Sequence, residues 1–220
     1  MKAYGLSPPR KAGEAWVGAN RCRQTIRKLI WRQSPAPGAA MSTPTIAVII
    51  GSLRKQSYNR QLARAVERLA GDRFAFQTLE IGELPLYNQD FDQDFPAVAL
   101  QFKRGIEQAD ALLIVTPEYN RSIPGVLKNA IDVASRPGGS TTFAGKRAGI
   151  IGISPGAHGT VSSQQHLRNV LAAVDVAVLP QPEIALQYKE GLFDANGDIA
   201  DERARKRLSL FLDRYEAWLR

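Results

Sequence analysis

The sequence predicts an α/β domain in which helices cover both faces of a doubly wound, five-stranded parallel sheet. Two observations carry this prediction. The first is the run TIAVII at residues 45–50, which is unbroken and rich in β-branched residues, as in strands buried on both faces of a parallel sheet. The second is the alternation of further apolar segments with helical patterns along residues 43–220. Parallel strands need such helical crossovers, which are right-handed.

The remaining strands and the helices follow from the same patterns. We expect strands at residues 74–79, 111–115, 148–153 and 176–179, and helices at residues 58–70, 98–108, 123–134, 162–174 and 201–219. In the first of these helices Leu62, Ala63, Val66 and Leu69 share one face, as in a helix that packs on a sheet. Residues 82–96 contain Pro, Asn and several Asp, and they form a long connection of the kind that is often functional or mobile.

The composition is that of a globular protein, with 220 residues, of which 44% are hydrophobic and 23% charged. This length suits one α/β domain of ordinary size. No apolar run approaches the roughly 18 residues that a membrane-spanning helix needs. The single cysteine, Cys22, excludes an internal disulfide framework and a cysteine-based metal cluster, and two histidines leave little material for a zinc site. We therefore expect no metal and no membrane span.

The net charge of +8 would by itself suggest a polyanionic partner such as nucleic acid. The distribution of charge argues against that interpretation. Residues 1–40 carry eight basic residues and one acidic residue, whereas residues 41–220 carry 21 basic and 20 acidic residues. The basicity therefore belongs to the first part of the chain, and we expect no nucleic-acid partner.

Residues 1–42 are expected to form a basic leader outside the native domain, which covers residues 43–220. The breaker-rich segment SPAPG at residues 34–38 separates the two parts. A secretory signal is disfavoured because its apolar core would be too short, and an organellar transit peptide fits the arginines but not the two Trp and the scarce Ser. We favour Met41 as the natural start. A basic membrane-surface helix around residues 21–33 is a weaker alternative.

Doubly wound sheets bind ligands beyond the carboxyl ends of their strands, which directs attention to the loops after strands one, three and four. The first loop, GSLRKQS at residues 51–57, supplies hydroxyls and cations but no carboxylate, and it opens onto a helix start that attracts phosphate. It lacks the Gly-Lys-Ser/Thr triplet of a nucleotide P-loop and the glycine spacing of a dinucleotide fingerprint. The loop favours phosphate modestly, and Ser57 as an ordinary helix N-cap is the alternative.

The loop after the third strand, TPEYNRSIPG at residues 116–125, is stiffened by two prolines. Tyr119 offers a flat ring and Asn120 an amide that can bind polar ring edges, although Tyr119 as a buried packing residue is an alternative. Glu118 has no neighbouring carboxylate in sequence, so we expect it to make a structural hydrogen bond rather than to act as a general base.

The loop after the fourth strand, SPGAHGT at residues 154–160, contains glycines that would let its backbone approach a flat ligand closely. His158 either lines the site or is incidental, and His166 on the following helix is expected to be structural. No nucleophile–base constellation is visible in the three loops. This pattern points to a cofactor that carries the reaction.

Two motifs in these loops resemble those of a known family. Gly-Ser-Leu-Arg-x-x-Ser-x-Asn follows the first strand, and Pro-Glu-Tyr-Asn-x-Ser-x-Pro-Gly-x-Leu-Lys-Asn-Ala-Ile-Asp, residues 117–132, follows the third. Together they resemble the NAD(P)H-dependent FMN reductases, and in particular the bacterial branch that reduces quinones and chromate. The resemblance covers residues 43–220 and implies a flavodoxin-like fold with non-covalently bound FMN.

The resemblance also implies roles for individual residues. It assigns the FMN phosphate to Ser52, Arg54, Ser57 and Asn59, the isoalloxazine ring to Pro117, Glu118, Tyr119 and Asn120, and the pyrimidine side of the ring to Ser154 and Gly156. Arg121 would lie at the open face of the ring, where several relatives carry an aromatic or small residue, and would contact the nicotinamide or the acceptor. No residue is expected to be catalytic by itself, because the flavin carries the chemistry.

The implied activity is a ping-pong reaction in which NADPH or NADH reduces bound FMN and an acceptor then uses the same face. Quinones, free flavin and chromate are the implied acceptors, and the implied assembly is a homodimer or homotetramer in the cytoplasm. Two alternatives remain open. One is a flavodoxin-type electron carrier without NAD(P)H turnover, and the other is a regulatory or interaction module that keeps the fold.

Overall fold

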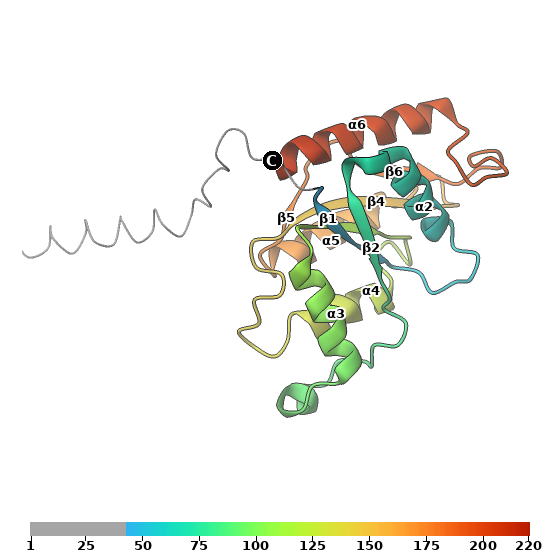
Figure 1. The fold of residues 1–220 in the computed structure, drawn as a ribbon. Helices are drawn as coiled ribbons and strands as arrows, with labels where there is room; N and C mark the ends of the chain where they lie inside the picture. The colour runs from blue at the N-terminus through green and yellow to red at the C-terminus, as the bar shows by residue number, and fades with distance from the viewer. Residues whose placement is uncertain (1–42) are drawn as a thin grey trace, which may run out of the picture. The chain divides into compact units, whose positions relative to one another are not determined.

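The computed structural model describes residues 43–220 (Figure 1), so the leader predicted over residues 1–42 lies outside the described residues. The strands are β1 (Thr45–Ile50), β2 (Ala75–Leu79), β3 (Ala111–Val115), β4 (Arg147–Ser154), β5 (Ala177–Val178) and β6 (Ile184–Gln187). The α-helices are α2 (Tyr58–Ala70), α3 (Ala97–Gln108), α4 (Gly125–Ala134), α5 (Val161–Ala172) and α6 (Glu202–Leu219). Two short 3₁₀ helices, η1 (Gly71–Arg73) and η2 (Gln89–Gln93), lie in the connections.

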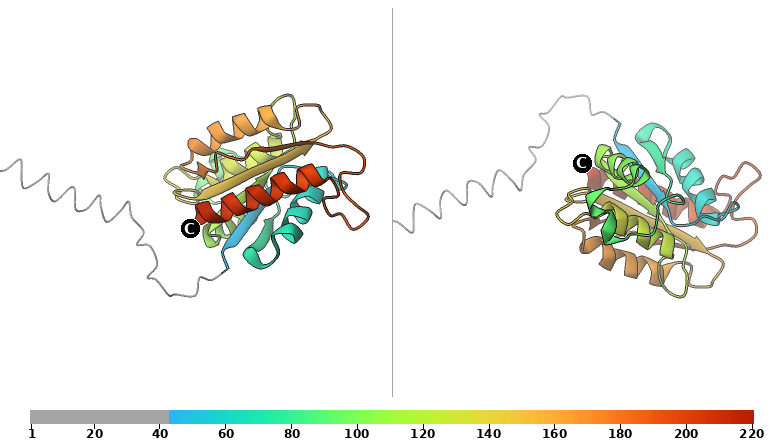
Figure 2. Two further views of the ribbon diagram at one scale, coloured as in Figure 1. Left: turned by 90° about the horizontal axis from the view of Figure 1, so that it is seen from above. Right: turned by 90° about the horizontal axis from the view of Figure 1, so that it is seen from below.

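All strand pairs in the sheet are parallel, and the order is β2-β1-β3-β4, with β5 and β6 both paired to the outer edge of β4. Helices α2 and α6 cover one face and α3, α4 and α5 cover the other, as the two views in Figure 2 show. Alternate residues of β1 enter the two cores: Ile46 and Val48 face α2 and α6, while Ala47 and Ile49 face the opposite layer. The predicted doubly wound α/β sheet with helices on both faces is confirmed.

The edge of the sheet beyond β4 differs from the prediction. Instead of one strand over residues 176–179, β5 pairs with Arg147 and Ala148, and β6 pairs with residues 151–154 further along β4. Pro180 and Pro182 lie between the two segments. Proline has no N–H to donate to the neighbouring strand, so the edge strand is interrupted there.

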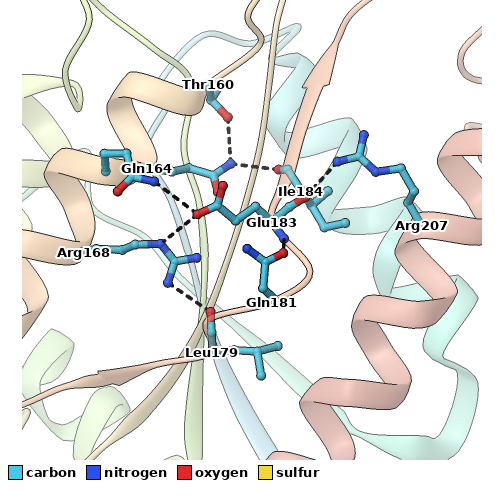
Figure 3. A network of polar contacts seen from close by, with 9 residues as sticks. Thr160, Gln164, Arg168, Leu179, Gln181, Glu183, Ile184 and Arg207 are labelled. Atoms are coloured by element: carbon cyan, nitrogen blue, oxygen red, sulfur yellow. Dashed lines mark hydrogen bonds and ion pairs between the residues drawn. The ribbon is translucent and has the colours of Figure 1, made fainter.

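Side chains of α5 and α6 hold the interrupted edge in place (Figure 3). From α5, Arg168 Nη1 donates a hydrogen bond of 3.0 Å to the Leu179 carbonyl, before the interruption. Beyond it, Gln164 Nε2 donates to the Ile184 carbonyl at 2.8 Å, and Arg207 Nη2 of α6 donates to the Glu183 carbonyl at 2.8 Å. These bonds satisfy carbonyls that the interrupted ladder leaves unpaired.

No helix within residues 43–220 is long and apolar enough to cross a membrane. Over the same residues, no group of three or more His, Cys, Asp or Glu side chains is arranged to hold a metal ion.

Candidate functional site

The loops after β1, β3 and β4 begin side by side at one edge of the sheet. Ile50 is in register with Val115, and Val115 is in register with Ile151. The N–H of Gly51 donates to the Val115 carbonyl at 2.9 Å, and the N–H of Thr116 donates to the Ile151 carbonyl at 3.0 Å. The three strands therefore deliver their loops to the same place, at the switch point where doubly wound sheets bind ligands.

The loop after β1 ends at the start of α2. Ser52 and Ser57 are buried, whereas residues 53–56 between them are exposed. Ser57 is the N-cap of α2, and its Oγ accepts a hydrogen bond of 3.3 Å from the Arg60 N–H. No acidic residue lies in the first turn of α2, so its free N–H groups and positive dipole end are available to an anion.

Arg54 lies across the outside of this loop. Its Nε and Nη2 donate to the Gln56 carbonyl at 3.1 and 2.5 Å, and its guanidinium lies 4.6 Å from the centroid of the Tyr58 ring. Tyr58 in turn stacks on Tyr188, with the ring centroids 3.7 Å apart and the planes at 16°. The main-chain N–H of Tyr188 donates to the Ser154 carbonyl at 2.8 Å. A three-layer stack therefore connects the first loop to the end of β4.

Tyr58 and Tyr188 were not among the residues expected at the site. Tyr58 lies inside the first motif, between Ser57 and Asn59, at a position for which the motif specifies no residue. Tyr188 follows β6, the strand that the sequence did not predict, and it reaches Tyr58 from 130 positions further along the chain.

Asn59 is buried, and its side chain binds main-chain groups of β4. Its Nδ2 donates to the Ile153 carbonyl at 2.9 Å, and its Oδ1 accepts from the Ile153 N–H at 3.1 Å. The amide thus joins the start of α2 to the end of β4. The resemblance assigned Asn59 to the phosphate; the structure places both ends of its amide on Ile153.

The loop after β3 forms a tight hairpin. The N–H groups of Tyr119 and Ser122 each donate to the carbonyl of the other residue at 2.9 Å. Between them, Asn120 and Arg121 have φ values of 50° and 61°. A two-residue turn with both central residues in the left-handed region has the type I′ geometry. The turn presents Tyr119, which is 56% exposed, so the buried-packing alternative for this ring is wrong.

Helix α5 fixes the hairpin on both sides. The Glu118 carboxylate accepts a hydrogen bond of 3.0 Å from the Ser163 N–H in the first turn of α5, and Ser163 Oγ donates to the Pro117 carbonyl at 2.9 Å. Further along α5, His166 Nδ1 lies 3.0 Å from Ser122 Oγ. Glu118 therefore caps a helix, which is the structural role expected of it, and His166 supports the turn.

The loop after β4 approaches its neighbours closely. Ser154 Oγ accepts a hydrogen bond of 3.2 Å from the Gly156 N–H, which shapes the start of the loop. The next residues, 155–158, are exposed and include His158. Gly159 has a φ of 59°, and a Cβ atom there would lie 2.8 Å from the Leu186 carbonyl oxygen. Glycine is required at this position by both the backbone conformation and the space.

The long connection between β2 and α3 is also anchored close to the second motif. Asn129 of α4, which lies in that motif, accepts from the Tyr87 N–H at 2.8 Å and donates to the Pro85 carbonyl at 2.9 Å. The Tyr87 hydroxyl donates to Asp92 at 3.1 Å, and burial together with this carboxylate raises the pKa of Tyr87. The Asn of the second motif therefore anchors the long connection between β2 and α3.

The assembled residues fit a flat ligand with a phosphate at one end. The phosphate end would meet the start of α2, where residues 51–57 contain Arg54, Lys55, Ser52 and Ser57 and no carboxylate. The flat part would meet the exposed ring of Tyr119 and the glycine-containing loop after β4. FMN has this shape and charge distribution, and all ten residues expected to bind it lie on this edge of the sheet.

Comparisons with known proteins agree with this geometry. Residues 44–191 match the sequence model of the NADPH-dependent FMN reductase family. A 2-hydroxy-1,4-benzoquinone reductase from a Burkholderia species is 55% identical over 175 residues, which are 80% of this chain and 96% of that protein. The structure of a flavoenzyme NAD(P)H:(acceptor) oxidoreductase from Paracoccus denitrificans, FerB, is 43% identical and superposes with a TM-score of 0.77 over 80% of this chain and 97% of that one.

A flavodoxin, WrbA-like protein from Agrobacterium tumefaciens shares the fold, with 15% identity and a TM-score of 0.55 over 81% of this chain and 98% of its own. The flavodoxin-like fold implied by the two loop motifs is therefore confirmed. Because the family's sequence model matches 148 residues of the described domain and the Burkholderia relative is more than half identical, the chain belongs to the NADPH-dependent FMN reductase family.

Proposed function

We propose that this chain is an FMN-dependent oxidoreductase that transfers electrons from NADPH or NADH to quinones. The observation that carries the proposal is the meeting of a helix start without acidic residues and an exposed aromatic hairpin at one sheet edge, in a chain of this family. The Burkholderia relative, named for a hydroxyquinone, supports a quinone as the acceptor.

The chain would hold FMN through three groups of residues. The first turn of α2, Ser52, Ser57 and a reoriented Arg54 would bind the phosphate, and the hydrogen bonds of Asn59 to Ile153 would position that turn. The segment from Pro117 to Asn120 would lie along the ring, with Glu118 acting through the α5 cap that it makes. Ser154 and Gly156 would border the remaining edge of the ring.

FMN, when bound, would supply the two-electron chemistry that links NADPH or NADH to the acceptor. The protein's own contribution is binding and orientation, because the loops after β1, β3 and β4 contain one carboxylate, Glu118, and that carboxylate accepts the Ser163 N–H. The donor and the acceptor would use the open face beside Tyr119 in turn, which is a ping-pong order. Free flavin and chromate are further proposed acceptors at the same face.

We further propose that the activity resides in residues 43–220, that the protein is cytoplasmic, and that it works as a homodimer or homotetramer. The match of residues 44–191 to the family supports the first of these proposals.

The function is tested by steady-state oxidation of NADH and of NADPH with a benzoquinone, free FMN and chromate as separate acceptors. We expect the purified full-length protein to be yellow or to become yellow with added FMN, and to oxidise NAD(P)H fastest with the quinone. Removal of residues 1–40 should leave this rate within about twofold. A protein that binds FMN but never oxidises NAD(P)H would be an electron carrier, and a protein that binds no FMN would contradict the proposal.

Replacing Tyr188 with alanine should weaken FMN binding about three- to tenfold, because Tyr58, the first residue of the helix start that would bind the phosphate, loses the ring stacked on it. Tyr188→Phe keeps the ring and should bind FMN almost as the unmodified protein does. Titration with FMN and with riboflavin, which has no phosphate, shows whether the stack supports binding of the phosphate or binding of the whole flavin. A loss for FMN that exceeds the loss for riboflavin assigns the stack to the phosphate end. An equal loss for both flavins would contradict this assignment.

A further inference from the structure

Arg121 occupies a backbone conformation that does not suit arginine. It is the second central residue of the type I′ turn, with a φ of 61°, a position that glycine favours. Asn120, the first central residue, belongs to a residue type that tolerates the left-handed region. A side chain with a Cβ atom is strained there, and such strain is retained at functional sites where the surroundings impose it. The outlier points to a use for the guanidinium.

The base of the Arg121 side chain is also fixed in position. Tyr119 and Ser122 close the turn with two main-chain hydrogen bonds of 2.9 Å. His166 holds Ser122 from α5, and the Glu118 carboxylate holds the preceding segment to the start of the same helix. The turn therefore holds the backbone of Arg121 beside Tyr119, with support from α5.

The positive charge of Arg121 is not neutralised by its neighbours. Its side chain is exposed and makes no hydrogen bond or ion pair with any other residue in the part of the chain that the structure describes. The carboxylate of the same loop, Glu118, already binds the Ser163 N–H. Arg54, by contrast, lies on the Gln56 carbonyl and the Tyr58 ring. Arg121 is thus available to an anionic group that arrives from solution.

We propose that Arg121 selects acceptors that are anionic, specifically hydroxyquinones, over neutral quinones. The hydroxyl of a 2-hydroxyquinone is a vinylogous carboxylic acid, and its conjugate base spreads the negative charge over oxygens in the plane of the ring. The charged C2 oxygen lies beside the C1 carbonyl oxygen, and a guanidinium can donate one N–H to each of these two adjacent oxygens. This inference rests on the proposed quinone reductase function, since it concerns which quinones that site accepts.

The test uses full-length FMN-loaded protein that has been reduced beforehand, so that no nicotinamide is present. Stopped-flow oxidation is measured with 2-hydroxy-1,4-benzoquinone and with its neutral analogue 2-methoxy-1,4-benzoquinone. We expect the ratio of the two second-order rate constants to fall about tenfold in Arg121→Gln and Arg121→Gly, the effect of losing one exposed charge-assisted contact. Arg121→Lys keeps the charge and should retain most of the ratio.

Arg121→Gly also controls for folding. Glycine removes the backbone strain at this positive φ, so the melting temperature of the variant should equal or exceed that of the unmodified protein. Equilibrium dialysis of the oxidised protein against 2-hydroxy-1,4-benzoquinone gives a second readout without turnover, and binding should weaken to the same extent. An unchanged ratio of the two rate constants in Arg121→Gln would overturn the inference. Failure of the unmodified protein to reduce either quinone would instead refute the proposed function.

Discussion

Replacing Gly152 with alanine is expected to lower the free energy of unfolding by about 3 kcal/mol, in the range of the costlier overpacking substitutions. Gly152 lies in β4, where a Cβ atom would overlap the Thr116 carbonyl oxygen and Thr160 Oγ1. The carbonyl belongs to the main chain just after β3, so it has no rotamer that would make room. The strands β3 and β4 would have to move apart at the point where their loops form the site.

The same substitution should also weaken FMN binding. Thr116 opens the hairpin loop and Thr160 precedes α5, whose first turn holds Glu118. A shift at either residue moves the hairpin relative to the loop after β4. Urea unfolding of the flavin-free protein measures the stability, and a titration with FMN measures the affinity.

Gly125→Ala is the matched control for this experiment. Gly125 is the first residue of α4, and a Cβ atom there would meet nothing within 4 Å. Alanine is preferred over glycine in a helix, so this variant should be as stable as the unmodified protein or more stable by up to about 1 kcal/mol. If Gly152→Ala unfolds at the same urea concentration as Gly125→Ala, the strands are not in the close contact described above.

The elements of the fold were predictable because their signals are local. The unbroken apolar runs of β1 and β3 and the one-sided apolar pattern of α2 mark these elements in the sequence, and their predicted bounds coincide with the observed ones. The other helices begin and end within two residues of the predicted positions. Each of these signals depends only on residues within the element itself.

The edge strand was not predictable in this way. The four residues of β6 follow a proline-containing segment, and their pairing with residues 151–154 depends on β4, which is more than 30 positions earlier. Short apolar segments of this length carry no reliable period. The interruption is stabilised by Arg168 and Arg207, which come from two different helices and carry no sign of that role in the sequence.

The site, like the fold, was predictable only where the signals are local. Its loops follow from the strand order, and the motifs predict which residues within them would bind FMN. The contacts between these residues could not be predicted from the sequence, because they join distant segments: Glu118 with Ser163, and Tyr58 with Tyr188. Asn59 illustrates the difference most clearly, since its place in the first motif suggested a phosphate ligand and its amide binds Ile153.

Asn59→Ala is therefore expected to cost about 2–4 kcal/mol of unfolding free energy, because it leaves the N–H and the carbonyl of Ile153 without partners in a buried place. Gln165→Ala is the control: this amide is exposed and makes one hydrogen bond of 3.2 Å to Glu183, so its loss should change stability by less than about 0.5 kcal/mol. Chemical denaturation of the flavin-free proteins measures both. Equal stabilities of the two variants would contradict the structural role of Asn59.

Asn59→Asp separates that role from direct phosphate binding. The new carboxylate would face the Ile153 carbonyl oxygen, and burial against this oxygen would raise the pKa of the carboxyl above the usual value of about 4. The folded protein would then hold a proton that the unfolded chain releases, so the unfolding free energy should fall as the pH rises above about 4. The stability of Asn59→Ala should lack this pH dependence. If Asn59 acts only through Ile153, folded Asn59→Ala keeps its preference for FMN over riboflavin, because the α2 start, Ser52, Ser57 and a reoriented Arg54 would still bind the phosphate. A selective loss of FMN binding with riboflavin binding unchanged would instead place the Asn59 amide on the phosphate itself.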